Sequence, residues 1–199
     1  MSPRRPVAGE DRYRALRAVA DRLNPHFELA LDLAYATGHR ITAILNLRWE
    51  DVSLAPRHDA PFGTIRWRAE HDKIRNEHIA PLNQIARDAL VNAQRERPGI
   101  GGAWLFTTEK NPAAPTAYRT AKRWLRKAEE LAELDHLKGD GWHAFRRGWA
   151  TARKAYPLKD VAQAGGWKST SSLLQCYQHA DAETVFRVVT EPAGKRSAG

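Results

Sequence analysis

A tyrosine near the end of the chain raises the question of covalent chemistry. Tyr177 lies in the stretch LLQCYQHAD, and a phenolic hydroxyl becomes a nucleophile when a nearby base or cation helps it to ionise. Most tyrosines in proteins are instead amphipathic side chains that bury a ring and hydrogen-bond one oxygen. The stretch alone favours this second interpretation, so the other groups of the chain must decide between the two.

Two further side chains have a spacing that suits chemistry on a phosphate. In the stretch WHAFRRGWAT, His143 and Arg146 are three residues apart and therefore share one face of a helix. A guanidinium binds phosphate oxygens through two parallel hydrogen bonds, and an imidazole can take up a proton as a general base. A single His-x-x-Arg pair also occurs by chance in many helices, so these two residues are weak evidence by themselves.

Other kinds of reactive centre have little support in the sequence. It contains no tight cluster of carboxylates, no spacing of histidines and cysteines typical of a metal site, and no glycine-rich phosphate loop. The nearest approach to a ligand pair is His71-Asp72, which we interpret as polar residues of a turn. We therefore expect neither a bound metal ion nor a cofactor.

The charge of the chain indicates a polyanionic partner. The sequence has 32 lysines and arginines against 23 acids, a net charge of +9 and a pI near 10.0, which most simply suits nucleic acid. A basic protein without such a partner is the alternative. Residues 119–154 hold ten basic and five acidic side chains, so we expect the nucleic-acid face there. The predicted DNA-binding residues are Arg119, Lys122, Arg123, Arg126, Lys127 and Arg147.

Length and composition suit one domain with a substantial core, because the chain has 199 residues of which 42% are hydrophobic. The apolar runs are too short to span a bilayer, and the N-terminus lacks the apolar region of a secretory signal. The single cysteine, Cys176, suits a reducing compartment. We place one domain at residues 10–190, a linker or disordered arm at 1–9, and a disordered tail at 191–199.

Hydrophobic periodicity predicts the elements that must position these side chains. Apolar residues at helical spacing predict helices over residues 10–23 and 26–36. The Thr37-Gly38 pair should end the second of these, since glycine at a C-terminal cap stops a helix. A further helix is predicted directly after Arg40, with apolar residues that face the core.

The only β signal lies in the middle of the chain. Residues 64–68 alternate apolar and polar side chains, and residues 77–80 suit a return strand across a polar turn. Residues 116–134 predict the clearest amphipathic helix, and a short helix is expected at about 182–189. The predicted fold class is therefore α+β and mostly α-helical, with a small antiparallel sheet.

Four stretches in order give the chain a family resemblance. They read ATGHRITAILNLRWEDV, HDKIRNEHIAPL, HAFRRGWAT and AGGWKSTSSLLQCYQH. Together they resemble the motifs of the catalytic domain of the tyrosine recombinases, the phage integrase family, over about residues 10–189. The resemblance implies a three-stranded sheet in a helical domain, and it places the catalytic groups at Arg40, Lys73, His143, Arg146, Trp167 and the nucleophile Tyr177.

The resemblance also implies a reaction and partners. The reaction is site-specific DNA recombination or integration, in which a strand is cut and rejoined through a 3′-phosphotyrosyl intermediate without a metal ion. Lys73 would protonate the leaving 5′-oxygen as general acid. The partner would be double-stranded DNA, with self-assembly into a tetrameric synapse, in the cytoplasm and nucleoid of a prokaryotic or viral host cell. The family's N-terminal DNA-binding domain is expected to be absent from these residues.

Four features depart from the family pattern and keep alternatives open. Ala43 stands where many members have an acid, Arg147 replaces a second histidine, Trp167 replaces a commoner histidine, and the gap from Trp167 to Tyr177 is one residue longer than in many members. Ala43 weakly favours a catalytically inactive DNA-binding module of the same fold. A type IB-like topoisomerase shares the chemistry but relaxes supercoils, and the integrase-like motifs disfavour it. A basic helical regulator without covalent chemistry leaves the ordered motifs unexplained.

Overall fold

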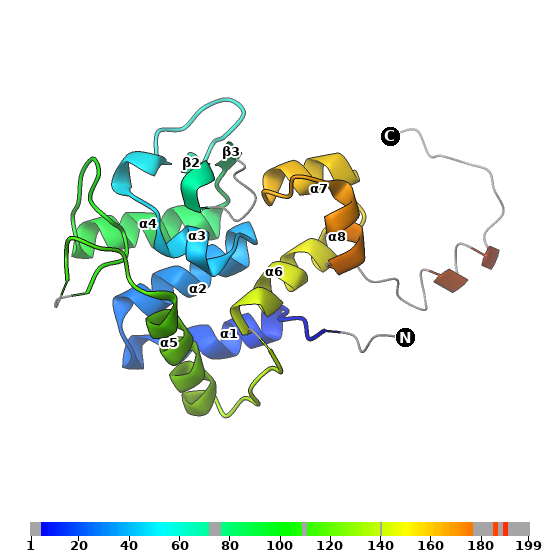
Figure 1. The fold of residues 1–199 in the computed structure, drawn as a ribbon, viewed down its shortest axis with the longest axis horizontal. Coiled ribbons are helices and arrows are strands. Elements are labelled where there is room, and N and C mark those ends of the chain that lie inside the picture. The colour runs from blue at the N-terminus through cyan, green and yellow to red at the C-terminus, as the bar shows by residue number, and fades with distance from the viewer. Residues whose placement is uncertain are drawn as a thin grey trace.

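The computed structural model is mostly helical, with one small sheet, and confirms the predicted α+β class. It describes residues 5–71, 77–108, 111–139, 141–176, 185–186 and 189–190. Figure 1 shows α1 to α5 and the sheet gathered in one larger group, with α6, α7 and α8 beside it. Within the described residues the helices are α1 (Glu10–Arg17), α2 (Pro25–Thr37), α3 (Ile41–Leu45), α4 (Gln84–Glu96), α5 (Tyr118–Leu131), α6 (Gly141–Ala152), α7 (Leu158–Ala164) and α8 (Thr170–Cys176), with short 3-10 turns η1 (Ala20–Arg22), η2 (Trp49–Asp51) and η3 (Ala69–His71).

Helix α2 is the centre of the core. Asn24 caps it, because its side chain accepts a hydrogen bond from the Phe27 amide at 3.0 Å, and Pro25 occupies the first turn. Almost all of its apolar side chains are buried, and it packs against α4 and α6. A helix that is buried on nearly every side needs apolar residues all round, as α2 has.

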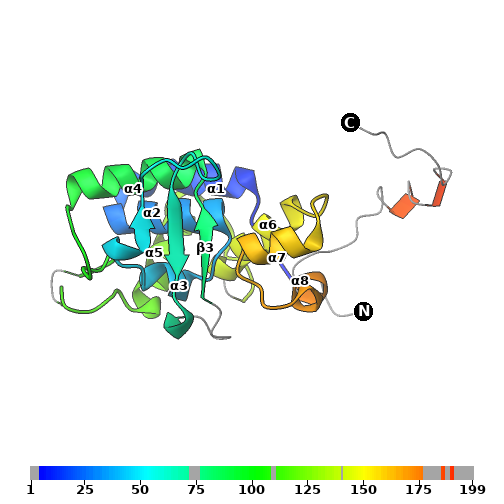
Figure 2. The ribbon, with the colours of Figure 1, turned by 90° about the horizontal axis from the view of Figure 1, so that it is seen from above.

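The sheet is antiparallel, and its strand order is β1 (Val52–Ser53), β2 (Thr64–Trp67), β3 (His78–Pro81). Ile65 and Trp67 point from β2 into the core, as the alternation in the sequence predicts. Trp67 pairs with His78 across the ladder. Figure 2 shows β2 and β3 side by side with α7 next to β3, and α7 contacts β3.

Helix boundaries differ from the predictions in two places. The helix predicted over residues 10–23 ends at Arg17 and continues as the turn η1, because Pro25 requires an extended Asn24 and the chain must turn before it. Helix α5 is shorter than the predicted 116–134. Ala117 is still extended at its start, and Glu133 is left-handed (φ 53°) beyond its end.

Some helices and the first described residues were not anticipated by periodicity. Helices α4, α7 and α8 have no counterpart among the predicted elements. The predicted arm at residues 1–9 includes Ala8, which is 2% exposed and whose amide donates to the Ala144 carbonyl at 3.0 Å. The first described residues therefore pack on α6 instead of lying free. No helix in the described part of the chain is long and apolar enough to cross a membrane.

Candidate functional site

Arg40 is positioned by the abrupt end of α2. Gly38 takes the left-handed conformation (φ 66°) at the C-cap, where a side chain would be strained, and an added Cβ would lie 2.5 Å from the Trp149 ring. Two residues later, Arg40 is the N-cap of α3 in an extended conformation. The Thr37-Gly38 stop predicted from the sequence is confirmed, and it places Arg40 at a fixed turn beside α6.

Arg146 links this turn to the loop after α7. Its side chain is 1% exposed, and its Nη1 donates to the carbonyls of Gly38 and Gly165, both at 2.7 Å. The guanidinium carbon lies 3.5 Å from the centre of the Trp167 ring, a cation–π contact. One arginine on α6 therefore holds together the ends of α2 and α7, and its positive charge is fixed in place.

Trp167 covers Arg146 from the α7 side. Its own amide donates to the Ala162 carbonyl at 2.7 Å, and its ring stacks at 5.9 Å on Trp149, whose indole donates to Ala36 at 3.0 Å. The family resemblance places Trp167 among the catalytic groups. The structure adds a packing role, because the Trp167 ring packs against the Arg146 guanidinium.

Two histidines meet directly beside this junction. His39 is 5% exposed, stacks on Trp67 with ring centres 3.6 Å apart, and has its Nε2 3.0 Å from the Nε2 of His78. The His39 Nδ1 lies 3.1 Å from the Thr37 carbonyl oxygen. Burial, together with Arg146, His78 and Arg40, lowers the pKa of His39 well below its ordinary value. The charges of Arg40 and Arg146 thus both act on this one ring.

His143 and Arg146 lie on α6 one turn apart, as their spacing predicts, and His143 is half-buried. Lys73 and Tyr177 lie outside the described residues, as does most of the predicted helix at 182–189. The elements that flank them are described: β3 begins at His78, and α8 ends at Cys176. The structure therefore brings together the turn that carries Arg40, Arg146 and Trp167. The catalytic roles of all the predicted site residues stay predictions.

The predicted DNA-binding residues on α5 form one exposed basic face. Arg119, Lys122, Arg123, Arg126 and Lys127 are all exposed, while Ala121, Leu125 and Ala128 on the opposite side are buried. Four of the five cations line a groove of about 430 Å³ between α5 and residues 136–141. Glu130 pairs with Lys127 at 3.3 Å and lies 3.9 Å from Arg126. Glu130 therefore partly neutralises the cations in the C-terminal half of the helix, and the positive charge at its N-terminal end is less neutralised.

Arg147 differs from the five residues on α5. It is 4% exposed, and its Nε donates to the Pro6 carbonyl at 2.6 Å. A guanidinium buried in this way anchors the N-terminal segment on α6 and is not part of an exposed basic face. We therefore remove Arg147 from the predicted DNA-binding set. The position of the family's second histidine is used here for packing.

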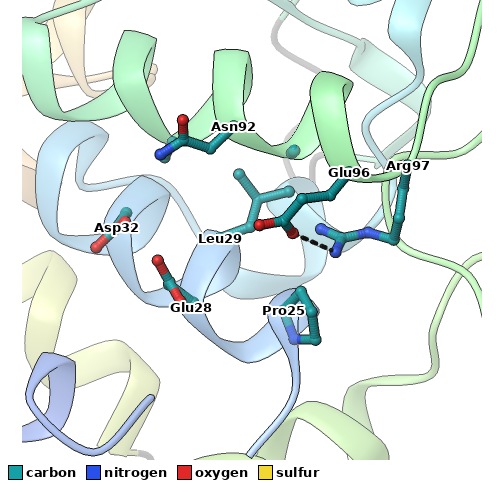
Figure 3. A pocket seen from close by; sticks show the side chains of 9 residues that line it. Pro25, Glu28, Leu29, Asp32, Asn92, Glu96 and Arg97 are labelled. Carbon is teal, nitrogen blue, oxygen red and sulfur yellow. Dashed lines mark hydrogen bonds and ion pairs between the residues drawn. The ribbon is translucent and has the colours of Figure 1, made fainter. Parts of the chain in front are cut away.

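A small cavity elsewhere in the fold does not suit a phosphate. It lies between α2 and α4, has room for about one water molecule (20 Å³), and is lined by three carboxylates, Glu28, Asp32 and Glu96, with one guanidinium, Arg97 (Figure 3). The guanidinium of Arg97 is paired with Glu96 at 3.1 Å. An anion would meet a net negative lining there, so the basic junction around Arg146 remains the better site.

Asp32 gives a prediction about the pH dependence of stability. It is 4% exposed, accepts a hydrogen bond from the Tyr13 hydroxyl at 2.9 Å, and burial raises its pKa to about 6 although Arg17 opposes the shift. The folded state therefore holds this proton more tightly than the unfolded state, and stability is lost as the pH rises from about 4 through about 6.

We expect Asp32→Asn to remove this loss. The free energy of unfolding of the variant, minus that of the wild type, should increase by about 2 kcal/mol between pH 4 and pH 7. Urea unfolding of both proteins across this range measures the difference, in which the titration of groups that do not interact with Asp32 cancels. A difference that stays constant or decreases with pH would contradict the raised pKa.

His39 and His78 carry no signal of their own in the sequence, although they lie inside the motif stretches ATGHR and NEHIAPL. Alternation along β3 places His78 and Ala80 on the same face of the sheet. In the structure His78 is the direct cross-strand partner of Trp67 on β2. No signal in the sequence joins residue 39 to residue 78. In the described part of the chain no group of three or more His, Cys, Asp and Glu side chains is arranged to hold a metal ion.

The chain is similar to known integrases. The family model of the phage integrase family matches residues 8–184. The prophage integrase IntF of Escherichia coli (strain K12) is 30% identical over 158 residues, which are 77% of this chain and 31% of that protein. The chain thus spans about a third of the length of this relative.

Solved structures of similar fold are recombinases. The crystal structure of XerA recombinase has a TM-score of 0.75 at 19% identity and covers 98% of this chain and 66% of that one. A lambda integrase dimer bound to a COC' core site has a TM-score of 0.69 at 20% identity, over 91% of this chain and 51% of that one. These likenesses show the fold of a tyrosine recombinase catalytic domain. Because the family model matches most of its length, the chain belongs to the phage integrase family.

Proposed function

We propose that the chain is the catalytic domain of a site-specific recombinase that cuts and rejoins DNA strands through a covalent bond to Tyr177. The observation that carries the proposal is the position of Arg146, whose guanidinium is fixed where the Arg40 turn, the Gly165 carbonyl and the Trp167 ring meet. Membership of the phage integrase family supports the same reaction.

The proposed step is a displacement at phosphorus. The Tyr177 oxygen attacks the phosphodiester and loses its proton to His143, while the bond from phosphorus to the 5′-oxygen breaks. Lys73 donates a proton to that oxygen, so the products are a 3′-phosphotyrosyl bond and a free 5′-hydroxyl. Attack by the 5′-hydroxyl of another strand reverses the step, and no external energy source is needed because the phosphate ester is conserved.

The described residues supply charge stabilisation for this step. Negative charge accumulates on the non-bridging phosphate oxygens in the transition state, and arginines are suited to bind it. Arg146 is buried and bonded to two backbone carbonyls, so its positive charge is held in one position. A fixed charge in a region of low dielectric acts more strongly than one in water. This preorganisation is the structural basis that we propose for catalysis.

The basic face of α5 is the proposed contact with the DNA backbone. Arg119, Lys122 and Arg123 are exposed, and no ion-pair partner for them exists among the residues that the structure describes. Each phosphate that a lysine or arginine neutralises releases counterions and adds about 0.9 to the slope of log affinity against log salt. The lambda integrase structure is that of a dimer on a DNA core site, and we propose that this chain also assembles on double-stranded DNA.

We expect the triple variant Arg119→Gln, Lys122→Gln, Arg123→Gln to bind DNA more weakly and with less salt dependence. The slope of log affinity against log salt should fall in magnitude by about 2 to 3, because up to three phosphate contacts are lost. Fluorescence anisotropy with a labelled duplex over a range of salt concentrations measures both quantities.

A matched control carries Arg22→Gln, Arg57→Gln and Arg95→Gln, three exposed arginines on other elements. This control has the same net charge as the α5 variant. Its slope should stay close to that of the wild type. Equal slopes for the two triple variants would show that α5 is not the DNA-binding face.

Covalent trapping tests the proposed function. The protein is mixed with supercoiled plasmid and quenched with SDS, and protein-linked DNA is sought that protease treatment releases. Linked DNA is expected. Relaxed plasmid without any exchange of strands would favour a type IB-like topoisomerase. DNA binding without linked DNA would favour the inactive DNA-binding module that Ala43 suggests.

A further inference from the structure

The contact between His39 and His78 joins three parts of the chain that the catalytic proposal needs. His39 lies in the turn before Arg40, and His78 begins β3. The loop after α7 covers the contact, because a Cβ added to Gly166 would lie 2.5 Å from the His78 ring and 3.2 Å from the His39 Nε2. Gly166 is also left-handed (φ 67°), so only glycine is readily accepted at this position.

The partners of His39 determine which nitrogen carries its proton. The Thr37 carbonyl oxygen, 3.1 Å from Nδ1, can only accept a hydrogen bond, so Nδ1 carries the hydrogen. A neutral imidazole has one N–H, and its Nε2 is then an acceptor. The Nε2 of His78, 3.0 Å away, must be the donor. The hydrogen bond therefore runs from the His78 donor on β3 to the His39 acceptor in the turn before Arg40.

The surroundings keep His39 neutral and hold its ring in place. Trp67 of β2 stacks on it almost in parallel, at 6° between the planes. The charged and titratable groups that act on it are Arg146 from α6, His78 from β3 and Arg40 from the start of α3, and all three disfavour a positive imidazole. Arg146 bonds the carbonyls of Gly38 and Gly165, which flank the same contact.

We infer that His39 and His78 are a positioning pair, in which the hydrogen bond from His78 to His39 fixes β3 against the Arg40 turn so that the catalytic groups are aligned for DNA cleavage. Neither ring is proposed to touch the DNA. This inference rests on the proposed function, and it adds a device that the family motifs do not include. The pair acts through the backbone segments that carry Arg40 and bind Arg146.

The test uses two substitutions of equal length at residue 39. Glutamine in His39→Gln keeps an oxygen that can accept from His78, whereas methionine in His39→Met offers only a weakly accepting sulfur, and both lose the stacking on Trp67. We expect the rate of protein-linked DNA formation on supercoiled plasmid to fall about 100-fold in His39→Met, the cost of a misalignment of about 1 Å. In His39→Gln the rate should stay within about tenfold of the wild type. DNA affinity and melting temperature should be similar in the two variants.

A second comparison leaves both histidines in place. Gly166→Ala and Gly139→Ala each put a side chain on a left-handed residue, but a Cβ at Gly139 meets nothing within 4 Å. Gly166→Ala should slow cleavage at least tenfold more than Gly139→Ala. Equal rates for His39→Met and His39→Gln, or for the two alanine variants, would overturn the positioning role.

A readout without DNA separates this inference from the proposed function. Nitrogen-15 NMR of the histidine side chains should show the proton of His39 on Nδ1 and a proton of His78 on Nε2. If the wild type forms no protein-linked DNA but shows this pattern, the proposed function fails while the pair stands. A proton on the His39 Nε2 at neutral pH would overturn the pair itself.

Discussion

Tyr177→Phe is expected to abolish protein-linked DNA, with a decrease of at least about 1000-fold relative to the wild type. The substitution removes only the hydroxyl oxygen, and without that oxygen no bond to phosphorus can form. The ring remains, so DNA affinity in the same buffer should change by less than about twofold. The yield of SDS-resistant, protease-sensitive complexes on supercoiled plasmid measures the effect.

Tyr156→Phe is the matched control for this experiment. Tyr156 is 65% exposed and lies in the turn between α6 and α7. Its loss should leave the yield of linked DNA within about twofold of the wild type. Linked DNA that survives Tyr177→Phe would show that another side chain is the nucleophile, and the site assignment would then fall.

Arg146→Lys should reduce the cleavage rate about 1000-fold although the positive charge is kept. Lysine is a point charge on a flexible stem and cannot reproduce a planar guanidinium. It cannot both reach the Gly38 and Gly165 carbonyls, each 2.7 Å from Nη1, and stack on the Trp167 ring at 3.5 Å in the same way. Removing a preorganised group that stabilises the transition state typically lowers the rate 100-fold to 1000-fold or more, and we expect a loss of this size here.

Arg153→Lys is a suitable comparison because Arg153 follows α6, lies over the Trp149 ring at 4.1 Å, and donates to a backbone carbonyl at 3.1 Å. Its rate should stay within about threefold of the wild type. Melting temperatures of both variants must be measured, since Arg146 is also part of the core. If Arg146→Lys cleaves as fast as Arg153→Lys, Arg146 has only a structural role.

Local patterns predicted the elements of this fold better than their contacts. The periodicity of residues 26–36 and the Thr37-Gly38 stop identified α2 and its end, because both depend on neighbouring residues. The ends of α5 could not be predicted in this way. They depend on an extended Ala117 and on a left-handed Glu133, a conformation that a glutamate rarely adopts.

In the candidate site, too, local patterns predicted the elements but not the contacts between them. The spacing of His143 and Arg146 predicts that both lie on one helix, but Gly38 lies 108 residues before Arg146, and no periodicity reports that contact. The pairing of His39 with His78, 39 residues apart, was likewise invisible in the sequence. For Arg147 the sequence predicted a surface role that the structure does not support. Its place in a basic stretch suggested DNA binding, but its side chain is buried and donates to the Pro6 carbonyl.

Mass spectrometry of the trapped complex tests the central claim most directly. The SDS-quenched complex is digested with nuclease and trypsin, and the peptide that carries a nucleotide is sequenced. The account predicts a nucleotide joined through its 3′-phosphate to Tyr177, the only tyrosine in the tryptic peptide of residues 169–187. A nucleotide on any other residue, or one joined through its 5′-phosphate, would contradict the account.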